Sequence, residues 1–295
     1  MRYFIRFSAV LLLAAVAAAQ ENKLKVYIAA DMEGIGGVST WEVQADARGR
    51  EYEKFRQLMT QEVNAAVAGA FDAGASEVLV SDSHGDAQNI DVEALDKRAR
   101  LVRAWPRPLL MMQGIDSTFG AAVLIGYYAS QGQFPAILAH NLNSQRLMAV
   151  KFNGNSMPDA GLAAAIAGDF GVPVVLVSGD QTFGEEMKRL LGPIETVTVK
   201  QAIGFYAATM MHPEAAQHEI REGVKRALQR RGEIKPFRLT HPVKLEVTFK
   251  QTVNAEVVSY LPGVERLTGD TIAFTGRDMS EVSRFLSAIM FVSAF

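Results

Sequence analysis

The stretch "KVYIAADMEGIGG", residues 25–37, carries the most informative pattern in the chain. Its apolar first half predicts a buried β-strand, and its glycine-rich end predicts a turn. Asp31 and Glu33 stand two positions apart, so both carboxylates point to the same side of an extended chain. Two like charges held that close together are unfavourable unless a cation lies between them. The stretch therefore predicts a strand that ends in two close carboxylates, for which a cation site is one interpretation.

Beyond this stretch, short apolar runs alternate with helical patterns. "SEVLVSD" (76–82) and "VPVVLVSGD" (172–180) are typical of strands, and residues 51–74 show helical spacing that stops at Gly74. Near-continuous apolar strands between helices indicate an α/β fold, with a mostly parallel sheet covered by helices on both faces. The 295 residues, 49% of them hydrophobic, are enough for a substantial core.

The pattern changes after about residue 195. A long polar helix is predicted at 213–232, alternating strands at 243–249 and 269–276, and an amphipathic helix at 278–295. We therefore expect an α/β metal-binding core at 20–195, with a smaller C-terminal α+β subdomain at 196–295 packed on it.

The first 19 residues have the pattern of a secretory signal peptide. Arg2 and Arg6 precede an apolar run, which ends in Ala17-Ala18-Ala19 before Gln20. The run is shorter than a membrane-spanning helix requires, so we expect export, cleavage near Ala19 and no stable membrane association afterwards. The location is then periplasmic or extracellular; the alternative is an uncleaved anchor. The chain has no cysteine, which excludes disulfides.

Polar residues also follow other predicted strands. Asp82 and His84 come from "SDSH", His140 from "AHN" and Asp180 from "VSGD". The carboxyl ends of parallel strands meet at one edge of a sheet, and carboxylates with a neutral imidazole suit Zn²⁺ or a similar divalent ion. Each residue also has a simpler interpretation, because acidic residues after strands often cap the next helix and a lone histidine is often structural.

Several other functions lack support in the sequence. Net charge is −2 and no basic patch with interleaved aromatics is present, which disfavours a nucleic-acid partner. The glycines at 34, 36 and 37 match neither a P-loop nor the dinucleotide-binding spacing. His212, His218 and His241 lie in helix or loop contexts, and we expect them at the surface.

Taken together, seven segments resemble the D-aminopeptidase family, peptidase family M55, typified by the zinc D-aminopeptidase of a bacterial dipeptide-transport operon. The resemblance covers roughly residues 24–290. The segments are "AADMEGIGGV", "EVLVSDSHGDAQNI", "GIDSTFGAAVLIGYYA", "ILAHN", "GVPVVLVSGDQ", "VTVKQAIG" and "LPGVERLTGDTIAFTGRDM".

The resemblance implies a zinc site with one or two Zn²⁺ per chain. It makes Asp31, Glu33 and His84 metal ligands and His140 the catalytic residue. Two further ligand positions depart from the family pattern, since a histidine is replaced by Tyr128 and a glutamate by Asp159. The Asn that follows that glutamate in the family is Ala163, and the family's signature serine is Ala29. Tyrosine is a poor ligand at neutral pH because its pKa is about 10.

The resemblance therefore predicts an exported metal-dependent aminopeptidase or amidase that hydrolyses short peptides, including those with N-terminal D-amino acids. It also implies a homo-oligomer, a decamer. Two alternatives stay open. One is a family member with an altered one-metal site and a different substrate; the other is a non-catalytic exported binding protein.

Overall fold

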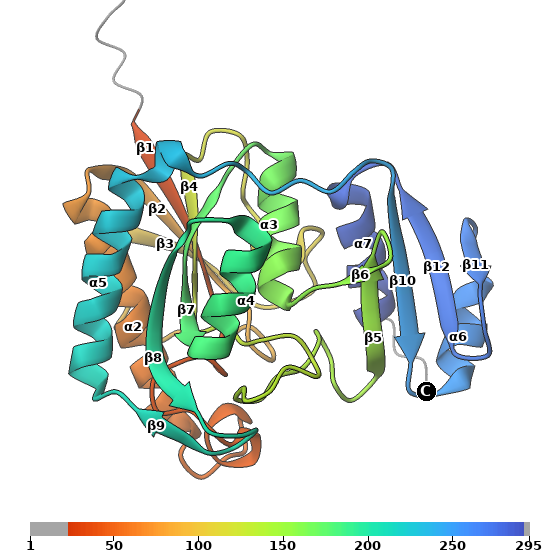
Figure 1. Cartoon of the computed structure of the whole chain (residues 1–295), viewed down its shortest axis with the longest axis horizontal. Helices are drawn as coiled ribbons and strands as arrows, with labels where there is room; N and C mark the ends of the chain where they lie inside the picture. Colours follow the sequence, from red (N-terminus) through yellow and green to blue (C-terminus); the bar gives the residue numbers. More distant parts are fainter. Residues whose placement is uncertain (1–22, 292–295) are drawn as a thin grey trace, which may run out of the picture.

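The computed structural model describes residues 23–291 and contains a seven-stranded sheet beside a five-stranded sheet (Figure 1). The predicted signal peptide, residues 1–19, lies outside the described residues. No helix within 23–291 is both long and apolar enough to cross a membrane.

The seven-stranded sheet is parallel except at one edge, where β9 runs antiparallel to β8. In spatial order its strands are β3 (Ala99–Val102), β2 (Ala75–Asp82), β1 (Leu24–Ala30), β4 (Ala121–Ile125), β7 (Val174–Asp180), β8 (Glu195–Ala202) and β9 (Ala208–Met210). The central strands β4 and β7 are buried along their whole length, as expected for strands covered on both faces.

Helices cover both faces of this sheet. From β1 the chain crosses to β2 on one side, and from β7 it crosses to β8 on the other. Right-handed crossovers in these opposite directions place α2 and α4 on opposite faces. The helix α5 packs against α2, and α3 packs against α4 (Figure 1). The helices are α2 (Tyr52–Asp72), α3 (Asp159–Asp169), α4 (Gln181–Leu191) and α5 (Pro213–Gln229).

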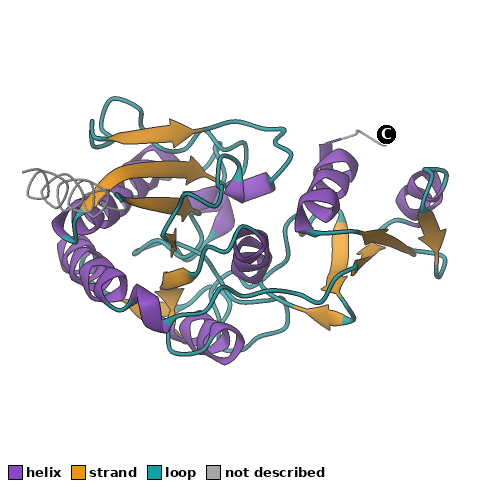
Figure 2. Cartoon of the chain, turned by 90° about the horizontal axis from the view of Figure 1, so that it is seen from above, coloured by secondary structure: helices purple, strands orange, loops and turns teal. Residues whose placement is uncertain are grey.

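The five-stranded sheet is antiparallel and lies to one side of the first, with α3 and α7 in contact between the two (Figures 1 and 2). Along its strand β10 (Val243–Phe249), buried and half-buried residues alternate, as predicted at 243–249. In spatial order its strands are β11 (Val264–Arg266), β12 (Thr271–Gly276), β10 (Val243–Phe249), β5 (Leu147–Phe152) and β6 (Asn155–Ser156); the helices α6 (Thr252–Ser259) and α7 (Met279–Phe291) accompany them.

The α/β fold is confirmed, but the two sheets do not divide the chain at residue 195. After that residue, β8, β9 and α5 still belong to the seven-stranded sheet, while β5 and β6 from before it pair in the five-stranded sheet. The change in local composition after residue 195 does not reveal which strands share a sheet. The strand β5 pairs with β10, which lies about a hundred residues later in the chain.

The strand order creates a crevice beside β1. The chain moves outward from β1 through β2 to β3 and then returns to the other side of β1 at β4. Ligands bind at such switch points, beyond the carboxyl ends of the strands. Three single-turn or irregular helices lie in the connections: η1 (Trp41–Ala45), η2 (Leu110–Met112) and η3 (Arg231–Glu233).

Candidate metal centre and active site

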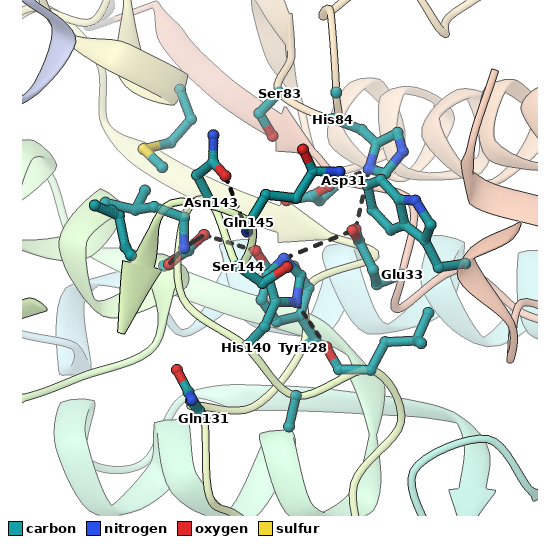
Figure 3. Close-up of a pocket in the computed structure, with 18 of the residues that line it drawn as sticks. Asp31, Glu33, Ser83, His84, Tyr128, Gln131, His140, Asn143, Ser144 and Gln145 are labelled. Carbon is teal, nitrogen blue, oxygen red and sulfur yellow. Dashed lines mark hydrogen bonds and ion pairs between the residues drawn. The ribbon is translucent and has the colours of Figure 1, made fainter. Parts of the chain in front are cut away.

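Asp31, Glu33 and His84 meet at the carboxyl ends of β1 and β2 (Figure 3). Their ligand atoms all lie within 4.8 Å of one another, and all three residues are buried. His84 Nδ1 lies 3.1 Å from Asp31 Oδ1 and 3.1 Å from Glu33 Oε2. The sequence prediction that these three residues converge is therefore confirmed, because β1 and β2 pair in parallel with Ala30 opposite Asp82.

The hydrogen bonding of His84 fits a metal ligand. Its Nε2 lies 2.7 Å from the carbonyl oxygen of Ala45, which can only accept, so Nε2 carries a proton. In the neutral ring, the lone pair on Nδ1 then faces two carboxylate oxygens, and a cation is needed between them. An imidazole whose second nitrogen donates to a backbone carbonyl is the usual arrangement around a protein-bound metal.

The pKa values of Asp31 and His84 also indicate that a positive charge is favoured between these groups. Burial raises the pKa of Asp31 well above its usual range, and the neighbouring Glu33 carboxylate raises it further. Burial by itself would lower the pKa of His84, but the Glu33 and Asp31 carboxylates raise it well above its usual range. A proton or a metal ion thus stabilises the same point between the three groups.

His140 lies next to this trio, with its Nε2 3.9 Å from Glu33 Oε1. The expectation that it ends a strand is wrong, since residues 135–141 form a loop. Their backbone groups bond to other partners: Ile137 N donates to Asp180 Oδ2 and Leu138 N to the Phe205 carbonyl. His140 Nδ1 is 2.7 Å from the Leu138 carbonyl and therefore carries the proton. In the neutral ring, the lone pair of Nε2 then lies on the side of Glu33.

Tyr128 and Asp159 bind each other at the site. The Tyr128 hydroxyl donates to Asp159 Oδ2 at 2.6 Å, and the tyrosine ring stacks on His140 with centroids 4.0 Å apart and planes 12° apart. Asp159 also accepts from the Leu142 amide at 3.0 and 3.1 Å. Burial and then Asp159 raise the pKa of Tyr128 well above its usual range, so the phenol is a donor at neutral pH. This arrangement supports the His140 ring directly. That Tyr128 and Asp159 are metal ligands stays a prediction.

A cavity of about 910 Å³ opens in front of these residues. Figure 3 shows Gln131, Asn143, Ser144 and Gln145 around it, together with the trio, Tyr128 and His140. The five-stranded sheet and its helices supply one wall, formed by Leu147, Lys250, Met290 and Phe291. The site thus lies between the two sheets and can hold a ligand of peptide size.

Two acidic residues that follow predicted strands have structural roles. Asp180 caps α4 by accepting a hydrogen bond from the Phe183 amide. This is the simpler interpretation, in which an acidic residue after a strand caps the next helix. Asp82 accepts from the amides of Asn89 and Ile90 and from the Asn89 side chain. Neither belongs to the metal-binding group found among the described residues.

The sequence reasoning missed Trp41 and Lys200. Trp41 lies between two imidazoles, with centroid distances of 5.2 Å to His84 and 6.4 Å to His140. Lys200 is a buried lysine on β8 that contacts the loop after β1. A lysine inside the strand "ETVTVKQA" was the available signal, because strands of a covered parallel sheet seldom carry an unpaired charge.

Comparison with known proteins places this geometry in a family. The family model described as D-aminopeptidase, peptidase family M55, matches residues 24–288. A D-aminopeptidase of Bacillus subtilis (strain 168) is 34% identical over 262 residues, which cover 88% of this chain and 93% of that protein.

A solved structure agrees. The Zn-dependent D-aminopeptidase DppA from Bacillus subtilis, described as a self-compartmentalizing protease, superposes with a TM-score of 0.87 at 32% identity. The match covers 92% of this chain and all of that one. With a matching family model, sequence similarity over most of its length and the same fold, this chain belongs to the D-aminopeptidase family.

Proposed function

We propose that the protein is a zinc-dependent aminopeptidase that removes N-terminal residues, D-residues included, from short peptides. The observation that carries the proposal is the buried trio of Asp31, Glu33 and His84, with His140 Nε2 3.9 Å from Glu33 Oε1 in a peptide-sized cavity. The activity and metal named for the relatives support the same conclusion.

Asp31, Glu33 and His84 would hold the metal, which when bound polarises a carbonyl or activates water. The Ala45 carbonyl fixes the tautomer of His84, so that Nδ1 is available as a ligand. His140 Nε2 is placed to accept a proton from the attacking water and to return it to the leaving amine. Tyr128 keeps the imidazole plane in place by stacking on it.

The test is hydrolysis of a D-alanyl anilide by the purified protein, with the L-alanyl anilide measured on the same preparation. We expect hydrolysis that a chelator stops and that added Zn²⁺ restores. In a metal-loaded His140→Ala variant, loss of general-base catalysis should lower kcat by roughly 10²- to 10⁴-fold with the metal content unchanged. Full metal occupancy without turnover in the unmodified protein would instead favour the binding-protein alternative.

A second candidate, a one-metal site, is favoured by the hydrogen bond between Tyr128 and Asp159. The two side chains are hydrogen-bonded to each other, and burial followed by Asp159 raises the pKa of Tyr128 well above its usual range, so the tyrosine keeps its proton at neutral pH. Metal analysis distinguishes the two versions, since about one equivalent of zinc per chain supports the altered site and about two equivalents contradict it.

Export and assembly complete the proposal. The pattern of residues 1–19 supports export, and mass spectrometry of the secreted protein should find Gln20 at its N-terminus. A full-length chain that stays in the cytoplasm would contradict this. The self-compartmentalizing relative supports a homo-oligomer, for which we propose a decamer. The mass of the purified assembly tests that number.

A further inference from the structure

Lys200 places a buried ammonium group against the loop that follows β1. The residue is 2% exposed. Its Nζ donates to the carbonyl oxygens of Glu33 at 2.5 Å, Ile35 at 2.9 Å and Val38 at 2.7 Å. An ammonium group has three N–H bonds, so this loop uses all of them. Three carbonyls from six consecutive residues therefore converge on one side chain.

The same loop is held from two other directions. The Gly36 amide donates to Glu62 Oε1 on α2 at 2.7 Å, and the Gly34 amide donates to the Gly126 carbonyl at 2.7 Å. Gly34 lies so close to this backbone that an added Cβ would be 2.0 Å from the Tyr127 carbonyl oxygen. The loop is thus fixed by contacts with β8, α2 and the end of β4, before any bound metal is considered.

Stability alone does not account for a lysine at this position. Burial lowers the pKa of Lys200 to about 8, because removing the ammonium from water is unfavourable. Apolar side chains of similar volume often stabilise a buried site better than charged groups do. Only a hydrogen-bond donor such as an ammonium group can hold three carbonyl oxygens close together, which an apolar side chain cannot do. One of these carbonyls belongs to Glu33, a member of the trio.

We propose that Lys200 is a positioning residue for the metal site, which holds the carbonyls of residues 33–38 and so sets the Glu33 carboxylate before the metal binds. The inference rests on the proposed metal site and assigns Lys200 a role within it. The residue does not contact substrate or metal; it acts through the backbone of Glu33.

The first experiment compares Co²⁺ binding to the unmodified protein and to Lys200→Met. The coordinated Co²⁺ absorbance reports both affinity and ligand geometry. Loss of an outer-shell partner typically weakens metal binding by about 10- to 100-fold, and we expect that loss together with a changed spectrum. The matched control is Lys188→Met at an exposed position on α4, which should bind Co²⁺ as the unmodified protein does.

The second experiment uses the unmodified protein, so the test stands even if Lys200→Met does not fold. After metal removal, hydrogen exchange is followed in the peptide that spans residues 33–38. Because Lys200 is already in place, these amides should stay protected without metal; exchange at the rate of an unstructured peptide would overturn the proposal.

The outcomes separate this inference from the proposed function. A folded Lys200→Met variant with unchanged Co²⁺ affinity and spectrum would overturn the positioning role and leave the metal site intact. If the unmodified protein binds no Co²⁺, the proposed function fails, and the positioning role fails with it.

Discussion

Tyr128 is placed to control the geometry of His140. Its ring stacks on the imidazole, and its hydroxyl ties it to Asp159, which also holds the Leu142 amide two residues beyond His140. The tyrosine thus links the ring of the proposed base to the backbone that carries it.

Removing only the Tyr128 hydroxyl tests this link. In Tyr128→Phe the stacking remains, but Asp159 loses a buried donor, a change worth about 1.5–3 kcal/mol. Because only part of that energy serves to hold His140, kcat should fall several-fold at an unchanged metal content. Tyr260→Phe is the control, since Tyr260 is 71% exposed. An unchanged kcat in Tyr128→Phe would contradict the positioning role.

Glu62 should make stability depend on pH. Burial raises its pKa to about 7 from an ordinary value of 4.5, and the Gly36 amide and Lys200 only partly oppose this. Between these values the folded state binds more protons than the unfolded state, so stability falls as pH rises. The contribution is fully present below pH 4.5 and is lost as pH passes through about 7.

The size of this effect follows from the shift. At about 1.4 kcal/mol per pKa unit, ionisation of Glu62 lowers the free energy of unfolding above pH 7 by roughly 3 kcal/mol relative to its value below pH 4.5. Urea unfolding of Glu62→Gln and the unmodified protein, measured from pH 4.5 to 8, should show the variant gaining relative stability by about that amount. A difference independent of pH would mean that Glu62 does not titrate in this range.

The loop between β1 and η1 is the element that joins fold and site. Gly34 has no space for a side chain, since an added Cβ would also lie 2.4 Å from the Gly126 carbonyl carbon. Both neighbouring groups are backbone and cannot turn aside. The glycines at 34 and 36 therefore serve close packing of the loop against β4 and Glu62 rather than phosphate binding.

Gly34→Ala should displace the loop. Such overpacking costs about 1–3 kcal/mol or more in unfolding free energy, and Zn²⁺ affinity should fall because Glu33 moves with the loop. Gly204→Ala is the matched control, since an added Cβ there meets nothing within 4 Å and the backbone is not left-handed. Thermal unfolding and zinc titration of both variants provide the measurements. Equal stability and affinity in the two variants would show that the loop has room to adjust.

At the scale of the whole molecule, the cavity depends on both sheets. The acidic residues of the trio follow β1, whereas Lys250 directly follows β10. Lys250 is the one lysine or arginine among the described residues that line the cavity. A short peptide has a positive amine at one end and a carboxylate at the other. We therefore expect Lys250 to favour substrates with a free carboxylate.

Lys250→Ala should raise KM for a D-alanyl dipeptide and leave KM almost unchanged for the anilide, which has no carboxylate. An exposed ion pair contributes about 0.2–1 kcal/mol, which corresponds to at most about a fivefold change. Lys188→Ala, at another exposed position, is the control. An equal change for both substrates would exclude recognition of the carboxylate.

The sequence by itself determined the α/β class and the meeting of Asp31, Glu33 and His84. These are consequences of local patterns, because hydrophobic periodicity identifies β1 and β2, and parallel pairing brings their carboxyl ends together. The family motifs added His140 as the catalytic residue. Sequence spacing was enough wherever the relevant residues follow neighbouring strands.

Only the tertiary structure decided the remaining features. It placed His140 on a loop and paired β5 with β10 in the five-stranded sheet. It also brought the Lys200 ammonium group to the carbonyl oxygens of Glu33, Ile35 and Val38. It also turned Tyr128 and Asp159 toward each other. These arrangements depend on contacts between residues far apart in the chain, such as the 167 positions that separate Lys200 from Glu33. No local pattern encodes such contacts, because packing of the complete chain sets which groups meet.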